Sequence, residues 1–410
     1  MKQLFNKDIP MKPVLKLFLF TGLVWATIVG PISSVIILFH LGASAPQIGI
    51  FTAIGAVVAM VCQPIWGYFT DKIRSPRLLT CLCLIGSAIF FSSIWFTESF
   101  YIAMILLLFE TIFRSSIIAL LDSHTLSEMK AIPGLQYSHI RMAGSLFYGL
   151  TSLFYSMIIN AFGVMTILPI SFLIAISAAC WGLITAKGQW EKNEMDGGHR
   201  AKVNLKKEAL SLFKNKGYIL FVIFVAFNAL AVMPLFVFSI EYVSFVGGKP
   251  GDVPMIHFLR CMVEIPFFIL IGAIGNRIST KMLLIAGICF SFIYLFGLLL
   301  ATNLPILVVA HMIGSIGFIL TLSGRMRYLR ETAPEAVLST SITVMGAFEI
   351  GVGSIAGNLI AGMVLGLFGT RAFTLISISA LCIAMILLLF LRTTPSPSLR
   401  GVADDEVIHN

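Results

Sequence analysis

The residues most able to do chemistry in this sequence are charged side chains placed inside long apolar stretches. Glu110 and Arg114 are four residues apart, so on a helix they share one face and can pair. Asp122, eight residues beyond Arg114, stays on roughly that face. Tyr148 follows Arg141 by seven residues and shares its face. Because a charge inside a bilayer is costly, these residues are predicted to bind or move a polar solute or a proton. The plainer alternative is a charge network that ties helices together.

Three ionisable residues of the C-terminal half are further candidates. Glu264 lies in the middle of an apolar stretch, where the neighbouring Pro266 loosens the backbone hydrogen bonding of a helix. Glu349 lies in a stretch rich in glycine, and His311 lies inside another apolar stretch. For His311, a hydrogen-bonded core histidine is as good an interpretation as a coupling residue.

The composition indicates an integral membrane protein. Of 410 residues, 58% are hydrophobic and 11% are charged, and the mean hydropathy is +0.97, which excludes a soluble domain. The formal net charge is +9, but the basic residues fall between apolar stretches and form no patch for nucleic acid. All seven cysteines lie inside apolar stretches, with neither metal spacing nor a disulfide framework. We therefore expect a bilayer around the protein, no nucleic-acid partner and no cofactor.

Twelve apolar stretches approach or exceed the length of about 20 residues that a bilayer core requires, so we predict an all-α membrane protein. Basic residues gather in alternate loops: Lys12 and Lys16 flank the start of the first stretch, and Arg325, Arg327 and Arg330 are assigned to the loop after the tenth. Under the positive-inside rule, both termini are cytoplasmic. The predicted stretches are 14–39, 46–70, 78–97, 100–128, 138–160, 164–186, 217–240, 253–275, 281–301, 304–326, 338–366 and 370–392.

One long polar segment, 187–216, separates the sixth stretch from the seventh. It predicts an N-terminal six-helix bundle over 1–186, a cytoplasmic linker, and a C-terminal six-helix bundle over 217–392. The remaining residues, 393–410, have the composition of a disordered cytoplasmic tail.

A short motif after the second stretch is repeated half a chain later. Its first glycine, Gly67, is expected to allow close helix packing, as is Gly55 before it. A weaker copy occupies 272–281, with Gly272 placed 205 residues after Gly67 in a chain of 410. This spacing indicates an internal duplication. The motif residues are Gly67, Asp71, Lys72, Arg74 and Arg77.

The pattern Gly-x-x-x-Asp-Lys-x-Arg-x-x-Arg with its weaker second copy resembles the loop motif of the major facilitator superfamily of secondary transporters. The resemblance implies the major facilitator fold of two pseudo-symmetric six-helix bundles. Because the motif lies at the cytoplasmic edge of the membrane, too far from the midplane to touch solute, we expect it to control the conformational cycle rather than binding.

A second resemblance is to the oligosaccharide:proton symporter branch, the relatives of lactose permease. It is carried by Asp122 and by Arg141-Met142-Ala143-Gly144 with an aromatic residue at 148. The resemblance implies that Asp122 and Arg141 grip solute hydroxyls, that Tyr148 stacks on the solute ring, and that His311 belongs to the site.

The proton chemistry of that branch does not carry over. Gly314 stands where the permease has its proton-carrying carboxylate, and Glu349 stands near the position of a lysine. A titrating carboxylate would therefore be Glu264, Glu349, or the pair of Glu110 and Asp122, with Arg114 beside it.

These features together predict a plasma-membrane secondary transporter, which takes up a small polar solute with protons, first a sugar or a nucleoside. The alternative within transport is drug or metabolite efflux, because 34 phenylalanines and 18 methionines can line an adaptable cavity. A membrane-embedded enzyme would need a nucleophile–base or metal constellation, and the sequence shows none. An ATP-driven pump would need a nucleotide-binding loop, which the sequence also lacks. A transporter-like receptor stays open. We expect a monomer whose partners are the solute and the bilayer.

Overall fold

The computed structural model describes residues 11–391, with gaps at 33, 74, 130–136, 186–214, 275–276 and 333–337. Every described segment is helical or connects helices, and the described residues contain no β-strand. The all-α prediction is therefore confirmed. The predicted linker up to residue 214 and the predicted tail lie outside the described residues.

Eleven helices of the described part are long and apolar enough to cross a membrane. The first ten follow the first ten predicted stretches in order. The last, Val344–Phe390, has 47 residues, more than twice the length of about 20 that one crossing requires. Inside it, Gly369 has a φ of +76°, a left-handed conformation that favours glycine. This break separates the two last predicted stretches.

The chain divides into two compact units. The first consists of 1–195 with 249–261, and the second of 196–248 with 262–410. The helices of the first unit are α1 (Met11–Ile32), α2 (Ser34–His40), α3 (Ala45–Ile73), α4 (Pro76–Ser92), η1 (Ser93–Phe96), α5 (Phe100–Arg114), α6 (Ile117–Met129), α7 (Tyr137–Phe162), η2 (Val164–Thr166) and α8 (Ile167–Thr185).

The second unit contains the π-helix η5 among its α-helices. Helix α12 (Asp252–Ile274) begins in the first unit and ends in the second, whereas the sequence pattern assigns it wholly to the C-terminal half. At the beginning of α12, the ring of His257 meets the ring of Tyr148 from α7, within the first unit. The other helices of the second unit are α10 (Lys216–Val237), α11 (Ser239–Phe245), α13 (Thr280–Leu300), α14 (Leu304–Thr332), α15 (Leu338–Phe348), η5 (Glu349–Ala356) and α16 (Gly357–Phe390).

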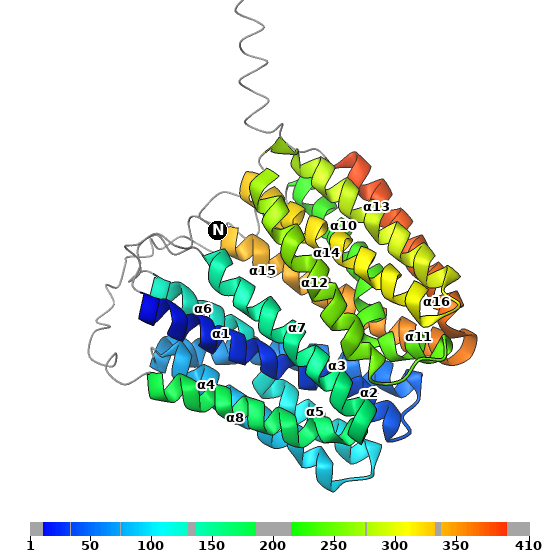
Figure 1. The fold of residues 1–410 in the computed structure, drawn as a ribbon. Helices are drawn as coiled ribbons and strands as arrows, with labels where there is room; N and C mark the ends of the chain where they lie inside the picture. The colour runs from blue at the N-terminus through cyan, green and yellow to red at the C-terminus, as the bar shows by residue number, and fades with distance from the viewer. Residues whose placement is uncertain are drawn as a thin grey trace, which may run out of the picture. The chain divides into compact units, whose positions relative to one another are not determined.

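In the first unit, α1 packs against α7 and α8, and α4 packs against α8 and α5 (Figure 1). Phe20, Val24, Leu84 and Leu121 form part of its core and are each at most 1% exposed. Helices that share a lipid environment are held by such close packing rather than by a hydrophobic driving force. This core fixes the relative positions of α1, α4 and α6.

The predicted helix over 100–128 is broken between α5 and α6, at Ser115 and Ser116. The carbonyl groups at the end of a helix have no partner within the helix. Here the side chain of Gln63 donates to the Ser115 carbonyl (3.2 Å), and the Trp66 indole donates to the Ile112 carbonyl (2.8 Å). These two bonds from α3 satisfy carbonyls at the end of α5.

In the second unit, small residues let helices approach closely. A Cβ at Gly317 of α14 would lie 2.9 Å from the Gly287 carbonyl oxygen of α13. A Cβ at Gly353 of η5 would lie 2.6 Å from the Ala229 Cβ of α10. Small residues at such seams are typical of membrane helices.

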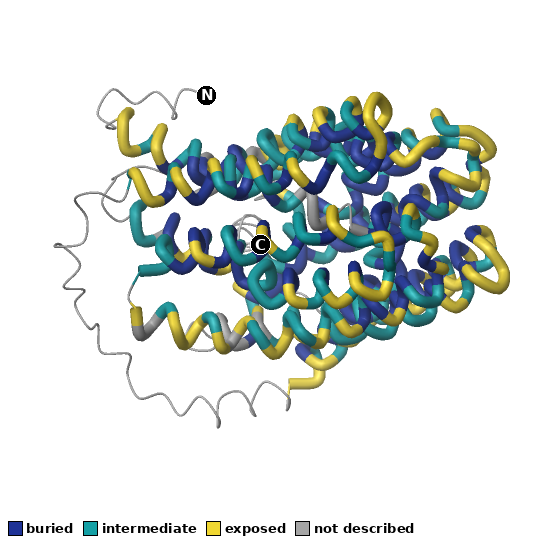
Figure 2. The backbone as a smooth tube through the Cα atoms, turned by 90° about the horizontal axis from the view of Figure 1, so that it is seen from below, coloured by how far each residue is buried: buried dark blue, intermediate teal, exposed yellow. Residues whose placement is uncertain are grey.

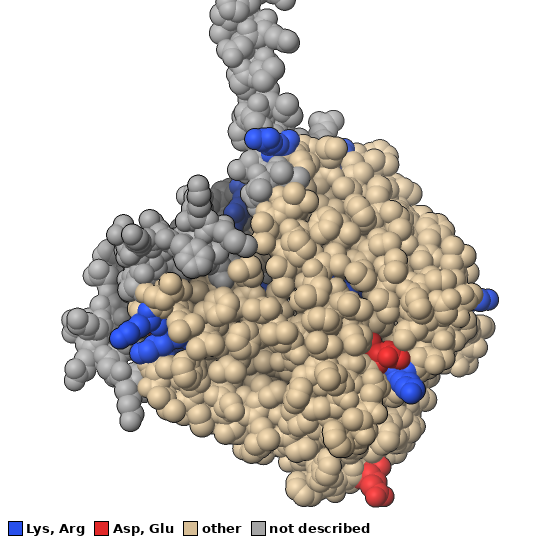
Figure 3. Space-filling view, viewed as in Figure 1, with Lys and Arg blue, Asp and Glu red and all other residues tan. Residues whose placement is uncertain are grey.

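The exposed surface is mostly apolar. Exposed residues line the outer sides and the ends of the helices in Figure 2, and they include large apolar side chains such as Phe96, Phe162 and Leu367. On the face drawn in Figure 3, few of the described residues are charged. An apolar exposed surface of this kind fits contact with lipid.

Candidate functional site

Arg141 lies near the beginning of α7, and its guanidinium stacks on the ring of Trp25 from α1. The guanidinium carbon is 3.7 Å from the ring centroid, well inside the distance of about 6 Å that defines a cation–π contact. Gly144, one turn on, makes this possible, because a Cβ there would lie 2.6 Å from Trp25 Cδ1 and 2.8 Å from Arg141 Nη1. No spacing in the sequence connects Trp25 with Arg141.

Tyr148 lies two turns after Arg141 on α7 and is partly buried. Its ring meets the ring of His257 from α12 edge to face, with centroids 6.2 Å apart. Arg260, one turn further along α12, is 3% exposed. The same helix face of α7 therefore carries a guanidinium and an aromatic ring.

Asp122 lies on α6 and is partly buried. Its pairing with Arg141 stays a prediction. A two-residue break at 115–116 separates α5, which carries Glu110, from α6, which carries Asp122, and the proposed pairing of these two carboxylates also stays a prediction.

Glu110 and Arg114 form an ion pair on α5, as their spacing predicts. Arg114 Nε lies 3.0 Å from the Glu110 carboxylate, and the hydroxyl of Ser87 on α4 donates to Glu110 Oε1 at 2.8 Å. Glu110 is 1% exposed. The pair therefore joins α4 to α5, and a role in proton coupling stays a prediction.

Arg325 corrects the assignment of the basic residues after the tenth stretch to a loop. It lies within α14, is 2% exposed, and its Nη1 donates to Glu349 Oε1 at 2.9 Å. Helix α14 continues to Thr332, so Arg327 and Arg330 are helical as well. A loop was predicted because these basic residues come at the end of an apolar stretch. In the structure the helix continues through them, and Arg325 and Arg327 bond to the carboxylates of Glu349 and Glu331.

His311 and Glu264 lie on different helices of the second unit. His311 on α14 is 3% exposed; its Nδ1 is 2.9 Å from the Leu307 carbonyl oxygen, and its ring contacts that of Tyr294 with centroids 5.2 Å apart. These contacts fit the core interpretation, and a role in solute binding stays a prediction. Glu264 on α12 is partly buried, two residues before Pro266, which lies inside the helix.

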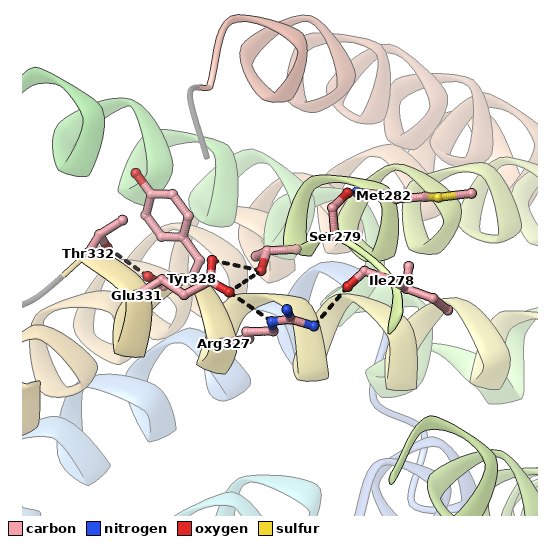
Figure 4. Close-up of polar contacts among 8 residues, drawn as sticks. Ile278, Ser279, Met282, Arg327, Tyr328, Glu331 and Thr332 are labelled. Carbon is pink, nitrogen blue, oxygen red and sulfur yellow. Dashed lines mark hydrogen bonds and ion pairs between the residues drawn. The ribbon is translucent and has the colours of Figure 1, made fainter. Parts of the chain in front are cut away.

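The second copy of the loop motif is held to the end of α14 (Figure 4). Arg327 Nη1 donates to the Ile278 carbonyl oxygen and its Nε to Glu331 Oε1, each at 2.8 Å. The Thr280 hydroxyl lies 2.8 Å from both Glu331 oxygens. Ser279 caps α13 by accepting a bond from the Met282 amide (3.2 Å). We call these contacts the α14 clamp.

The first copy has a corresponding arrangement. Ser75 caps α4 by accepting a bond from the Leu78 amide, 204 residues before Ser279. On α6, His124 and Glu128 each lie 203 residues before Arg327 and Glu331, and the His124 Nδ1 is 4.0 Å from Glu128 Oε1.

In this copy the cation comes from the loop motif. Arg77 interacts electrostatically with Glu128 and donates to the Thr185 hydroxyl of α8. Its guanidinium also lies 5.7 Å from the ring centroid of Phe20. Both copies therefore have a serine cap and an arginine that interacts with a glutamate, and the internal duplication stays a prediction.

Among the described residues, neither Gly67 nor Gly55 shows the close approach of a neighbouring helix that the sequence predicts. In the described part of the chain, no heavy atom lies within 4 Å of a Cβ built at Gly67, and at Gly55 the nearest atom is 4.0 Å away. Asp71 and Lys72 lie in the last turn of α3, but their side chains, and all of Arg74, are outside the described residues. The conformational role of the motif stays a prediction.

Among the described residues, no group of three or more His, Cys, Asp or Glu residues is arranged to hold a metal ion. The functional candidates that sequence reasoning missed are Trp25 and Arg325. For Trp25, the available signal was a tryptophan three residues after Gly22 in the first apolar stretch. For Arg325, it was an arginine directly after an unbroken apolar stretch.

Comparison with known proteins agrees with the fold. Residues 15–375 match the family described as MFS_1 like. The uncharacterized transporter YwbF of Bacillus subtilis (strain 168) is 24% identical over 323 residues, which cover 77% of this chain and 76% of that protein.

Solved structures give the same result. The nucleoside transporter NupG aligns with a TM-score of 0.75 at 14% identity over 92% of this chain and 97% of that one; a NupG mutant gives 0.76. A bacterial homolog of the human lysosomal transporter Spinster, inward-facing and unoccupied, aligns with a TM-score of 0.64 at 13% identity over 93% and 94% of the two chains.

Proposed function

Because this chain belongs to the MFS_1 like family of transporters, we propose that it takes up a nucleoside together with protons by alternating access. The proposal therefore specifies two things about this transporter: its solute class, a nucleoside, and its coupling ion, the proton. Assignment to the lactose permease-like branch is a finer proposal that rests on the motifs alone.

The observation that carries the proposal is the arrangement on α7. A guanidinium stacked on Trp25 offers fixed N–H donors, and Tyr148 two turns on offers an aromatic face. A solute that combines oxygen acceptors with a ring fits both groups, since rings stack on aromatic faces and oxygens accept from guanidinium. The likeness to NupG supports a nucleoside before a sugar.

Glu264 is the proposed proton carrier. It lies on α12, two residues before the helix-internal Pro266, in an apolar stretch where a permanent charge is costly. The neighbouring proline loosens the backbone hydrogen bonding of the helix there. Glu349 and the pair of Glu110 and Asp122 are the alternative carriers.

We further propose a plasma-membrane location, cytoplasmic termini, a monomer and no enzymatic activity. The loop motif and its copy would set the rate of the conformational cycle through contacts such as the α14 clamp.

A thermal-shift screen of the detergent-purified protein tests the solute class. A bound solute raises the melting temperature by mass action. We expect uridine to raise it, with lactose and ethidium giving smaller shifts or none. A shift with lactose and none with uridine would contradict the nucleoside assignment in favour of a sugar, and a shift with ethidium alone would favour drug efflux.

A further inference from the structure

We propose that Trp25 is a positioning residue for Arg141, whose guanidinium plane it fixes by stacking. The proposal rests on the proposed function in one respect only, that Arg141 contacts the solute. The positioning itself is a property of α1 and α7 and can be measured without any solute.

The stacking is close and specific. The guanidinium carbon lies 3.7 Å from the centroid of the Trp25 ring, and tryptophan is the best aromatic partner for a cation. A stacked guanidinium keeps one plane, so its N–H donors point in fixed directions. A solute that accepts from it then meets donors that are already oriented, which reduces the entropy lost on binding.

Two contacts, each between a glycine of one helix and an aromatic ring of the other, set the distance between α1 and α7. Gly144 of α7 receives Trp25 of α1, and Gly22 of α1 receives Phe147 of α7. A Cβ at Gly22 would lie 2.5 Å from Phe147 Cδ2, and one at Gly144 would lie 2.6 Å from Trp25 Cδ1. Any larger residue at either position would push the rings away. The glycine three residues after Arg141 is therefore required by the stacking.

The indole N–H has no part in this contact. Trp25 Nε1 is buried and has no hydrogen-bond partner in the described part of the chain. The ring face, rather than the N–H, is thus the functional group, and a phenyl ring in the same place should replace it in part.

The first test compares uridine affinity in Trp25→Phe and Trp25→Leu by calorimetric titration in detergent. Phenylalanine keeps a weaker cation–π face, so we expect a loss of about threefold, whereas leucine has none and should lose roughly tenfold. In an Arg141→Lys background, Trp25→Leu should cost no more than about twofold further, because Trp25 acts through Arg141. Equal losses for Phe and Leu, or additive losses with Arg141→Lys, would overturn the proposal.

Gly144→Ala tests the same contact through a change on α7 rather than on α1. The new methyl would displace the ring or the guanidinium, so we expect a loss of uridine affinity comparable to that of Trp25→Leu. Gly55→Ala is the matched control, since its nearest neighbour is 4.0 Å away. Wild-type affinity in Gly144→Ala would contradict the positioning role.

A measurement without solute separates this proposal from the proposed function. Phenylglyoxal modifies accessible guanidinium groups, and peptide mass spectrometry gives the rate at Arg141. Stacking should protect Arg141 in the wild type and in Trp25→Phe, while Trp25→Leu and Gly144→Ala should label several-fold faster. If uridine does not bind the wild type, the proposed function fails, yet faster labelling in Trp25→Leu would still support the positioning. Equal labelling in all four proteins would overturn it.

Discussion

Arg325 of α14 donates through Nη1 to Glu349 Oε1 across 2.9 Å, and Glu349 is the first residue of the π-helix η5. The Arg325 side chain is 3% exposed and that of Glu349 is 20% exposed. Arg325 Nε is buried and has no hydrogen-bond partner among the described residues, so Glu349 is the main compensation for this charge. Because the bond joins α14 to the first residue of η5, we infer that the pair holds η5 in its present arrangement; π-helical turns are frequent at functional sites.

Glu349→Gln should destabilise the protein by about 3 kcal/mol, because it leaves Arg325 buried without its charge partner. The double variant Arg325→Met with Glu349→Leu should recover most of that loss, since neither charge is then buried. Equilibrium unfolding in mixed micelles measures both. Arg330→Met, an exposed arginine on the same helix, is the control and should change stability by less than about 0.5 kcal/mol. Additive losses in the double variant would show that the two residues do not act as a pair.

The sequence predicted interactions within one helix better than those between helices. The pair of Glu110 and Arg114 follows from a spacing of four, which needs only helical geometry. Arg325 and Glu349 lie on different elements, and Trp25 and Arg141 lie on helices far apart in the chain, so no local spacing connects them. Gly144 has a close neighbour and Gly67 has none among the described residues, and this difference depends on the partner helix rather than on local sequence.

Helix number and order follow from hydrophobic length, which local sequence contains. The break between α5 and α6 does not, and the side chains that bond to carbonyls at the end of α5 come from α3, far away in the sequence. The division of α12 between the two units also depends on contacts, and sequence periodicity carries no information about them. The second copy of the motif was visible in the sequence because it repeats a residue pattern at a fixed spacing.

Arg141→Lys should weaken uridine binding by at least about tenfold although the charge is kept, because an ammonium lacks the planar, forked donor geometry of guanidinium. Calorimetric titration measures the affinity. Arg371→Lys is a suitable control, since Arg371 also lies over an aromatic ring, that of Phe245, at 5.4 Å but on α16. Unchanged affinity in Arg141→Lys would remove Arg141 from the solute site.

Tyr148→Ala should lower uridine affinity by about 1–3 kcal/mol, the value of burying a large side chain, whereas Tyr148→Trp should bind comparably or better. The same titration gives both values. Tyr101→Ala, at a tyrosine that is 63% exposed, provides the control and should bind as the wild type does. If Tyr148→Ala binds uridine fully, the ring at 148 serves only packing.

Asp71→Asn and Glu331→Gln should slow transport while leaving uridine affinity within about threefold of wild type. Asp71 lies in the first copy of the loop motif, and Glu331 joins Thr280 and Arg327 in the α14 clamp. Initial rates in proteoliposomes and equilibrium binding are measured on the same preparation. Losses of equal size in rate and affinity would argue for misfolding or for a direct role in binding.

The most direct test of the account is uphill accumulation of radiolabelled uridine in proteoliposomes under an imposed pH gradient. The wild type should concentrate uridine only when the outside is acidic. Glu264→Gln, which resembles the protonated carboxyl, should still bind and exchange uridine across the membrane but should not accumulate it. Accumulation that survives in both Glu264→Gln and Glu349→Gln, or uptake that ignores the pH gradient and follows sodium, would contradict proton coupling through the C-terminal half.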